Sequence, residues 1–226
     1  MTRDRRSQPA AKTVASPLAQ AARPDEAPPR RRTRAPHIRR AALMDAAEQL
    51  FLSKGVAATS VDDIVAAAQV AKGTFYLYFA SRDAMLGALQ QRFMQGFCER
   101  LDKALARPAA DDWDGRLRAW FEAALDGLLG QVMLHDMLFH DVRPDEREFM
   151  MGNPVLDQLA QLVQAGARAG AWQVADARAM AVMMFYAMHG LADDAVACGT
   201  ARRRKPMVQL LTRTFSRALR MNESEP

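Results

Sequence analysis

Residues 59–83 read TSVDDIVAAAQVAKGTFYLYFASRD, and this stretch decides the fold of the N-terminal part of the chain. Ser60 and Asp63 have the spacing of a capping box, in which each side chain satisfies a free backbone amide at a helix start. The apolar residues that follow have the i, i+3, i+4, i+7 spacing of one helical face: Val61, Ile64, Val65 and Ala68. A second short helix is expected over residues 72–78. Two short helices joined by a tight turn form a helix-turn-helix.

Upstream, a longer supporting helix is expected from Pro36 to Gly55. Proline suits a first helical position and glycine suits the residue after the last, and apolar residues recur at positions 43, 46, 47, 50 and 51. Downstream, a fourth helix should begin near Ser81 and continue until Pro108. Residues 36–82 are therefore predicted to form a three-helix head.

In the rest of the chain, helix-capping residues mark where most of the helices are expected to begin. Helices are expected from Trp113 to Leu129 behind Asp112, over the apolar segment 131–140, and from the Asn153-Pro154 pair to Gly170. Two more should run from Asp176 to Cys198 and onward from Pro206. Because no stretch shows the period-2 alternation of strands, we predict an all-α chain of about nine helices, with the head followed by a helical domain over residues 83–220.

The second helix of the helix-turn-helix has the chemistry of a DNA reader. Such a helix lies in the major groove, where Lys72 offers a cation, Gly73 permits close backbone approach and Thr74 offers a hydroxyl and a methyl group. Tyr76 and Tyr78 carry hydroxyls on rigid stems that reach toward phosphates. Phe75 and Phe79, four residues apart, are expected to anchor the helix in the core.

From Ile38 to Met85 the chain resembles the DNA-binding domain of the tetracycline-repressor (TetR) family. The matching stretches are Ala46-Ala47-Glu48-Gln49-Leu50-Phe51, Gly55, Thr59-Ser60-Val61-x-x-Ile64, Val70-Ala71-Lys72-Gly73-Thr74-Phe75-Tyr76-x-Tyr78-Phe79, Ser81-Arg82-Asp83 and Leu86.

The resemblance implies DNA-binding roles for individual residues. It places Lys72, Gly73, Thr74 and Tyr76 at bases or adjacent phosphates. It places Ser60, Tyr78 and Arg82 at the sugar–phosphate backbone. The alternatives are that the tyrosines are ordinary half-buried aromatics and that Arg82 is a solvated first-turn residue.

Two positions depart from the family's pattern. Gln69 stands at the turn where glycine is usual, and holding it at positive φ costs strain. Ala71 stands where serine often caps the recognition helix, so the first amides of that helix have no side-chain cap. Both departures make the operator sequence harder to infer.

Charge is concentrated at the N-terminus. Residues 1–40 hold eleven Lys/Arg and three acidic residues, net +8, whereas residues 41–226 are net −3. Residues 1–35, rich in Pro, Ala and Arg, are expected to be a disordered basic arm, and residues 221–226 a flexible tail. The arm either contacts a polyanion such as DNA or is only a solubilising leader.

The absence of export, membrane-spanning and catalytic motifs from the sequence limits where the protein is expected to act and what it is expected to do. The sequence has no secretory h-region and no apolar run long enough for a membrane span, so a cytoplasmic protein is expected. Cys98 and Cys198 are interpreted as reduced, buried residues. Because no catalytic constellation or phosphate loop is present, neither an enzyme nor a bound cofactor is predicted.

Residues 90–200 are rich in methionine and aromatic side chains, which suit a pocket for an apolar or planar ligand. The alternative is that they only pack a helical core, as we expect for His189. The residues predicted to bind ligand are Phe97, Trp120, Met133, Met137, His140, Met184 and Met188. His135, Asp136, His140 and Asp141 suggest a metal site. Asp136 and His140 are four residues apart and could face one metal ion, but two ligands are too few without a third from elsewhere. We therefore favour the interpretation that these side chains are polar groups inside or at the rim of the pocket.

The last two helices are predicted to form a homodimer interface. The final helix carries an apolar stripe that is costly to expose: Met207, Leu210, Leu211, Phe215 and Ala218. The sequence thus predicts a repressor that a small apolar or planar effector releases from a palindromic double-stranded DNA operator, with no membrane partner. The alternatives are an effector that promotes DNA binding and a non-specific nucleoid-type DNA-binding protein.

Overall fold

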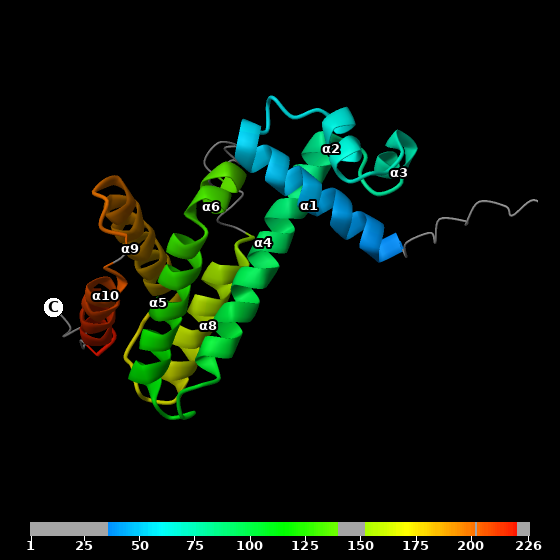
Figure 1. Cartoon of the computed structure of the whole chain (residues 1–226). Coiled ribbons are helices and arrows are strands. Elements are labelled where there is room, and N and C mark those ends of the chain that lie inside the picture. The colour runs from blue at the N-terminus through cyan, green and yellow to red at the C-terminus, as the bar shows by residue number, and fades with distance from the viewer. Residues whose placement is uncertain (1–35, 140–151, 202, 221–226) are drawn as a thin grey trace, which may run out of the picture. The chain divides into compact units, whose positions relative to one another are not determined.

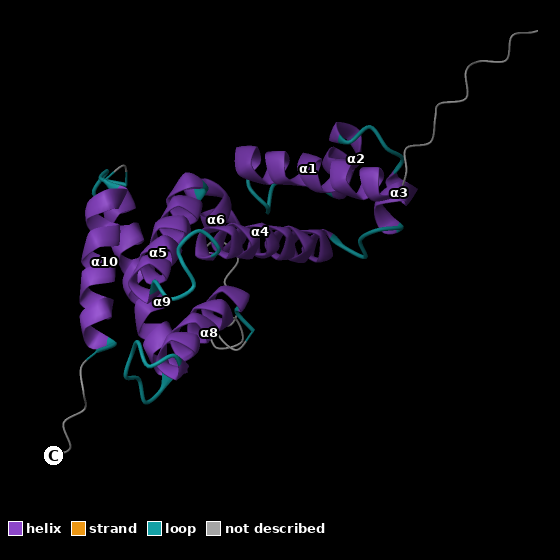
Figure 2. Ribbon diagram, turned by 90° about the horizontal axis from the view of Figure 1, so that it is seen from below, coloured by secondary structure: helices purple, strands orange, loops and turns teal. Residues whose placement is uncertain are grey.

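The computed structural model describes residues 36–139, 152–201 and 203–220, and their regular structure is entirely helical (Figures 1 and 2). The nine helices in these ranges are α1 (Pro36–Lys54), α2 (Val61–Ala67), α3 (Lys72–Tyr76), α4 (Arg82–Leu105), α5 (Trp113–Gly130), α6 (Val132–Phe139), α8 (Pro154–Arg168), α9 (Ala177–Ala197) and α10 (Arg204–Ala218). The predicted all-α fold class is confirmed. The predicted arm and tail lie outside the described residues.

Side-chain caps start most of these helices where the sequence predicts. Ser60 caps α2 in a complete capping box, and Ser81 caps α4. The side chains of Asp112, Asn153 and Asp176 accept backbone N–H groups at the starts of α5, α8 and α9. Because a cap depends on residues within one turn, these boundaries follow from local sequence.

Two helices differ from the predicted boundaries. Regular α3 ends at Tyr76, since the N–H groups of Tyr78 and Phe79 both bond to the Phe75 carbonyl as the chain turns away. Helix α10 begins at Arg204 rather than at Pro206. Proline is tolerated there because amides of the first turn have no partner within a helix.

The head is held by apolar side chains from all three of its helices. Leu43, Ala47 and Phe51 of α1 are buried together with Ile64 of α2 and Phe75 of α3. Helix α1 also packs against α2 and α4, and α2 packs against α3 (Figure 1). The recognition helix is therefore fixed to the longer helices by its own buried face.

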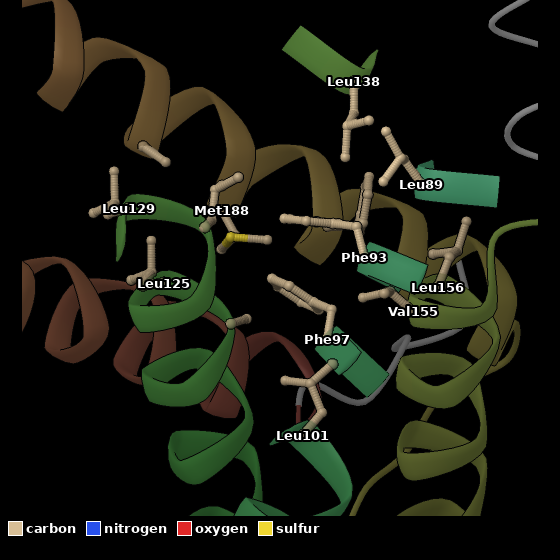
Figure 3. Packing of buried hydrophobic residues seen from close by; sticks show 14 of the residues in the cluster. Leu89, Phe93, Phe97, Leu101, Leu125, Leu129, Leu138, Val155, Leu156 and Met188 are labelled. Carbon is tan, nitrogen blue, oxygen red and sulfur yellow. The ribbon is translucent and has the colours of Figure 1, made fainter. Parts of the chain in front are cut away.

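The remaining helices enclose a second part of the core around α5, which packs against α4, α6, α9 and α10. Figure 3 shows Phe93 and Phe97 pointing from α4 toward α5 and α9, with Met188 of α9 beside Phe97. Helices α4, α5, α6, α8, α9 and α10 together form the body of the protein. Helix α4 also packs against α1, so the same helix supports the head and lines the body.

Two expectations about buried residues are wrong. Leu211 and Phe215, assigned to the dimer stripe, are buried against the chain's own α5, where the Phe215 ring stacks on Phe121 at 5.9 Å between centroids. Cys198 is exposed because it caps the end of α9, while Cys98 is half-buried; both are free thiols. Among the described residues, no helix is long and apolar enough to cross a bilayer.

Candidate nucleic-acid interface and effector cavity

The turn between α2 and α3 holds Gln69 at a φ of +55°, as its position in the motif predicts. The Val70 N–H bonds to the Val65 carbonyl at 3.0 Å, and the Gln69 N–H bonds to the Ala66 carbonyl at 3.2 Å. These two bonds form a Schellman motif, which normally has glycine at the left-handed position. The turn that orients α3 therefore carries backbone strain at Gln69.

Helix α3 has one buried and one open face. Phe75 is fully buried, whereas Tyr76 is 54% exposed and Leu77 is 76% exposed. A Cβ added at Gly73 would meet no atom within 4 Å, so the fold itself does not require a glycine there. The exposed residues Lys72, Gly73 and Tyr76 leave this face free to contact a partner.

Lys72 is held by an acidic neighbour that the sequence-based assignment missed. Its Nζ lies 2.9 Å from Oδ1 of Asp62 on α2, and this contact raises the pKa of Lys72. Both side chains are exposed, and ion pairs in such surroundings contribute little to stability. A phosphate can therefore compete with Asp62 for the ammonium group.

Ser60 is committed to the start of α2. Its Oγ accepts the Asp63 N–H at 3.1 Å and donates to Asp63 Oδ2 at 2.7 Å. Lys54 lies 2.8 Å from the same carboxylate and, with Ser60, lowers the pKa of Asp63. A phosphate contact donated by the Ser60 hydroxyl would require its hydrogen to leave Asp63.

Arg82 fastens the loop between α1 and α2. One of its terminal nitrogens, Nη1, donates to the carbonyls of Val56 at 3.0 Å, Ala57 at 3.2 Å and Thr59 at 3.1 Å. The Thr59 side chain is buried and donates to the Gly55 carbonyl at 2.8 Å. Arg82 therefore holds the segment that positions α2, a role that the sequence did not indicate.

Tyr78 and Thr74 are both half-buried, and Tyr78 packs against the core of the head. Of the seven residues predicted to contact DNA, the structure brings Lys72, Gly73, Thr74 and Tyr76 together on α3. Ser60 begins α2, Tyr78 follows α3 and Arg82 begins α4.

A small cavity of about 30 Å³ lies in the body, lined by residues of α4, α5, α6, α8 and α9 and by the α8 cap. Of the seven predicted ligand residues, Phe97 lines it. Trp120, Met137, Met184 and Met188 are buried in the surrounding core. His140 lies outside the described residues. The lining also includes Phe93, Asn153, Phe185 and His189, which are not among the predicted ligand residues, and His135, one of the polar groups expected at the pocket.

Met133 and His189 lie in surroundings that differ from those expected from the sequence. Met133 is 71% exposed and does not line the cavity, because it occupies the first turn of α6, on the solvent side. His189 is half-buried and lines the cavity, with its Nδ1 3.0 Å from the Phe185 carbonyl, so it is not solely the core residue that the sequence suggests. The described residues contain no cluster of three or more metal-ligating side chains.

Residues 43–89 match the family model for bacterial regulatory proteins of the tetR family. The HTH-type transcriptional repressor DhaR of Mycobacterium sp. (strain GP1) is 35% identical over 92 residues, 41% of this chain and 46% of that protein. The chain thus spans about half the length of this curated relative.

Solved structures resemble nearly the whole described fold. A protein of unknown function from Rhodococcus sp. RHA1 has a TM-score of 0.68 and 22% identity, covering 81% of this chain and 96% of that one. The flavonoid-responsive regulator FrrA has a TM-score of 0.65 and 23% identity, covering 82% and 99%. At these identities the likeness supports the shared helical fold.

Proposed function

We propose that the chain, whose residues 43–89 match the family model for bacterial regulatory proteins of the tetR family, is a homodimeric transcriptional regulator in the cytoplasm that binds a double-stranded DNA operator through α3. The observation that carries this proposal is the open face of α3. Gly73 and Tyr76 are exposed, and the absence of a side chain at Gly73 serves no packing need within the chain. Close approach of the α3 backbone to a DNA groove would instead require that this position has no side chain.

The proposed DNA contacts follow from the geometry of the head. Lys72, Gly73, Thr74 and Tyr76 are assigned to base edges and adjacent phosphates, and Tyr78 to the sugar–phosphate backbone. Ser60 and Arg82 act chiefly by positioning α2 and the loop before it, since their side chains are already bonded there. The basic residues of the N-terminal arm add contacts to phosphates.

A small effector regulates this binding in our proposal. Helix α6 lines the cavity with His135 and Phe139 and also packs against α1 of the head. The side chain of Gln90 in α4 donates to the Leu138 carbonyl of α6 at 2.7 Å, which ties the two helices together. A ligand that displaces α6 therefore acts directly on the helices that carry α3 and releases the operator.

Two recognition helices are needed to read a palindromic operator, and their spacing must match successive major grooves about 34–36 Å apart. The surface that suits a dimer lies on α9 and α10, where Met183, Tyr186 and Leu210 are exposed. Exposed apolar side chains on neighbouring helices are unfavourable in a monomer and favour a second copy as the partner.

The experiment that tests this function is selection of bound duplexes from a random DNA library, followed by competition with unrelated DNA. A palindromic consensus, bound about 10³-fold or more tighter than random duplex, is the expected result. Uniform binding of all sequences would instead support a non-specific nucleoid-type protein. Measuring operator affinity with and without effector then distinguishes an effector that releases the operator from one that promotes DNA binding.

A further inference from the structure

The cavity of the body contains a polar group that the fold leaves without a partner. Asn153, which begins α8, is 1% exposed and lines this cavity. Among the described residues, none accepts a hydrogen bond from its Nδ2 atom. Burying an amide donor without a partner is unfavourable, so such a group is rare unless something else satisfies it.

The orientation of this amide is fixed by the helix it caps. Asn153 Oδ1 accepts the N–H groups of Val155 at 3.0 Å and Leu156 at 3.3 Å. Rotating the amide by 180° would place NH₂ against two N–H donors and lose both bonds. The cap therefore holds Oδ1 on α8 and leaves Nδ2 as the donor available to a ligand.

The other lining residues indicate what kind of molecule fits. Phe93, Phe97, Phe139 and Phe185 supply aromatic surfaces, and the His189 ring lies 4.1 Å from that of Phe185 between centroids. No lysine or arginine is among the described residues that line the cavity. Aromatic walls with a fixed neutral donor match a flat, uncharged ring that carries a hydrogen-bond acceptor.

We propose that the effector is a neutral aromatic molecule with a carbonyl-type acceptor, and that Asn153 Nδ2 donates a hydrogen bond to that acceptor. This inference rests on the proposed function and adds the chemical class of its ligand. A dry cavity that admits benzene has a volume of roughly 150 Å³, several times the 30 Å³ present. Binding must therefore move a wall, and α6 provides one that also contacts the head.

Two probes of equal size test the inference: acetophenone, which has a carbonyl acceptor, and isopropylbenzene, which has none. Their dissociation constants are measured by calorimetry with the full chain and with Asn153→Asp. The aspartate keeps the Oδ1 cap of α8 but replaces the donor with an acceptor. Asn153→Ser is the second variant, since serine also caps helices and lacks the amide. Thermal melts establish that each variant is folded.

The expected result is a change specific to the carbonyl. Relative to isopropylbenzene, acetophenone should bind about 2- to 10-fold more weakly to either variant than to the unmodified chain. An unchanged ratio of the two dissociation constants in a folded variant overturns the role of Asn153. Failure of both probes to bind the unmodified chain overturns the ligand class.

Operator selection with the same protein preparation separates this inference from the proposed function. A chain that selects a palindromic operator but ignores both probes retains its DNA-binding function and loses only the ligand assignment. A chain that binds acetophenone through Asn153 but selects no DNA sequence retains the ligand site and loses the proposed function.

Discussion

Phe75 and Tyr76 are adjacent in α3, yet their rings lie in opposite environments. The ring centroids are 5.4 Å apart and the planes meet at 82°, with Phe75 fully buried and Tyr76 54% exposed. Successive residues of a helix point about 100° apart, which is enough to place one ring in the core and the next on the surface. One residue thus anchors the recognition helix while its neighbour faces outward.

This opposition predicts separable effects for two substitutions. Tyr76→Phe removes only an exposed hydroxyl, so the melting temperature should be nearly unchanged. If the hydroxyl bonds a phosphate, operator affinity should fall by about 0.5–1.5 kcal/mol for each subunit of the dimer, or up to roughly 3 kcal/mol for each fully engaged charged acceptor. Fluorescence anisotropy against the selected operator measures the affinity, and calorimetry measures the stability.

Phe75→Ala is the matched control. It removes a ring with no solvent exposure and should lower the free energy of unfolding by about 3–5 kcal/mol. DNA binding should be lost only as the head unfolds. A Tyr76→Phe variant that loses stability but keeps its affinity would show that Tyr76 is a packing residue.

Gln69 motivates a second prediction, because its φ of +55° is costly for a side chain that has a Cβ. Gln69→Gly should relieve about 1–2 kcal/mol of backbone strain in the folded state. Glycine also gives the unfolded chain more freedom, which offsets part of this effect, so the free energy of unfolding should rise by up to about 1 kcal/mol. Gln69→Val should destabilise the head, because β-branched residues are outliers at positive φ. Denaturant unfolding compares the two, and equal stabilities would mean that the turn is unstrained.

The N-terminal arm should contribute to DNA affinity through charge. Residues 1–35 contain nine Lys/Arg and three acidic residues. Deleting them should weaken operator binding and flatten the slope of log affinity against log salt, because fewer counterions are released. The melting temperature of the remainder serves as the folding control. Truncated protein with the original affinity and salt slope would identify the arm as a leader only.

Local chemistry explains which parts of the fold the sequence predicts. Ser60, Ser81 and Asn153 each cap a helix through an amide within three residues, and such contacts are readable from spacing alone. The cavity lining was largely missed, because it depends on how helices rotate against one another. Met188 and His189 are neighbours, yet only the histidine reaches the cavity.

The same reason accounts for the last helix. Its apolar residues predict an amphipathic face correctly, but the pattern does not reveal whether α5 or a second chain covers that face. Leu211 and Phe215 are used within the chain, and Leu210 remains exposed. Asn153 combines a predictable and an unpredictable feature. Its helix cap follows from local sequence, whereas the absence of a partner for its Nδ2 among the described residues depends on how the helices pack around the cavity.

The exposed apolar residues of α9 give a prediction about assembly. Tyr186 and Met183 stand on the same outer face of this helix, so Tyr186→Asp should place a charge in the proposed interface. We expect a dimer for the unmodified chain and a monomer for the variant by analytical ultracentrifugation at micromolar concentration. Leu52→Asp, at an exposed apolar position of α1, is the control that should remain dimeric. A monomeric unmodified chain that binds operator tightly would contradict the interface.

Arg82 gives the last prediction, because its structural bonds and its implied phosphate contact have different consequences. Arg82→Gln removes the charged donor that bonds to three carbonyls, and the free energy of unfolding should fall by about 1.5–3 kcal/mol. A side chain that acts only within the head contributes no released counterion, so the salt slope of operator binding should not change. Lys72→Gln is the matched control, since loss of this exposed cation should flatten the slope by about 0.9 for each subunit, or about 1.8 for the dimer, with little loss of stability. Should Arg82→Gln instead flatten the slope and leave unfolding unaltered, Arg82 contacts phosphate and its bonds to the loop are dispensable.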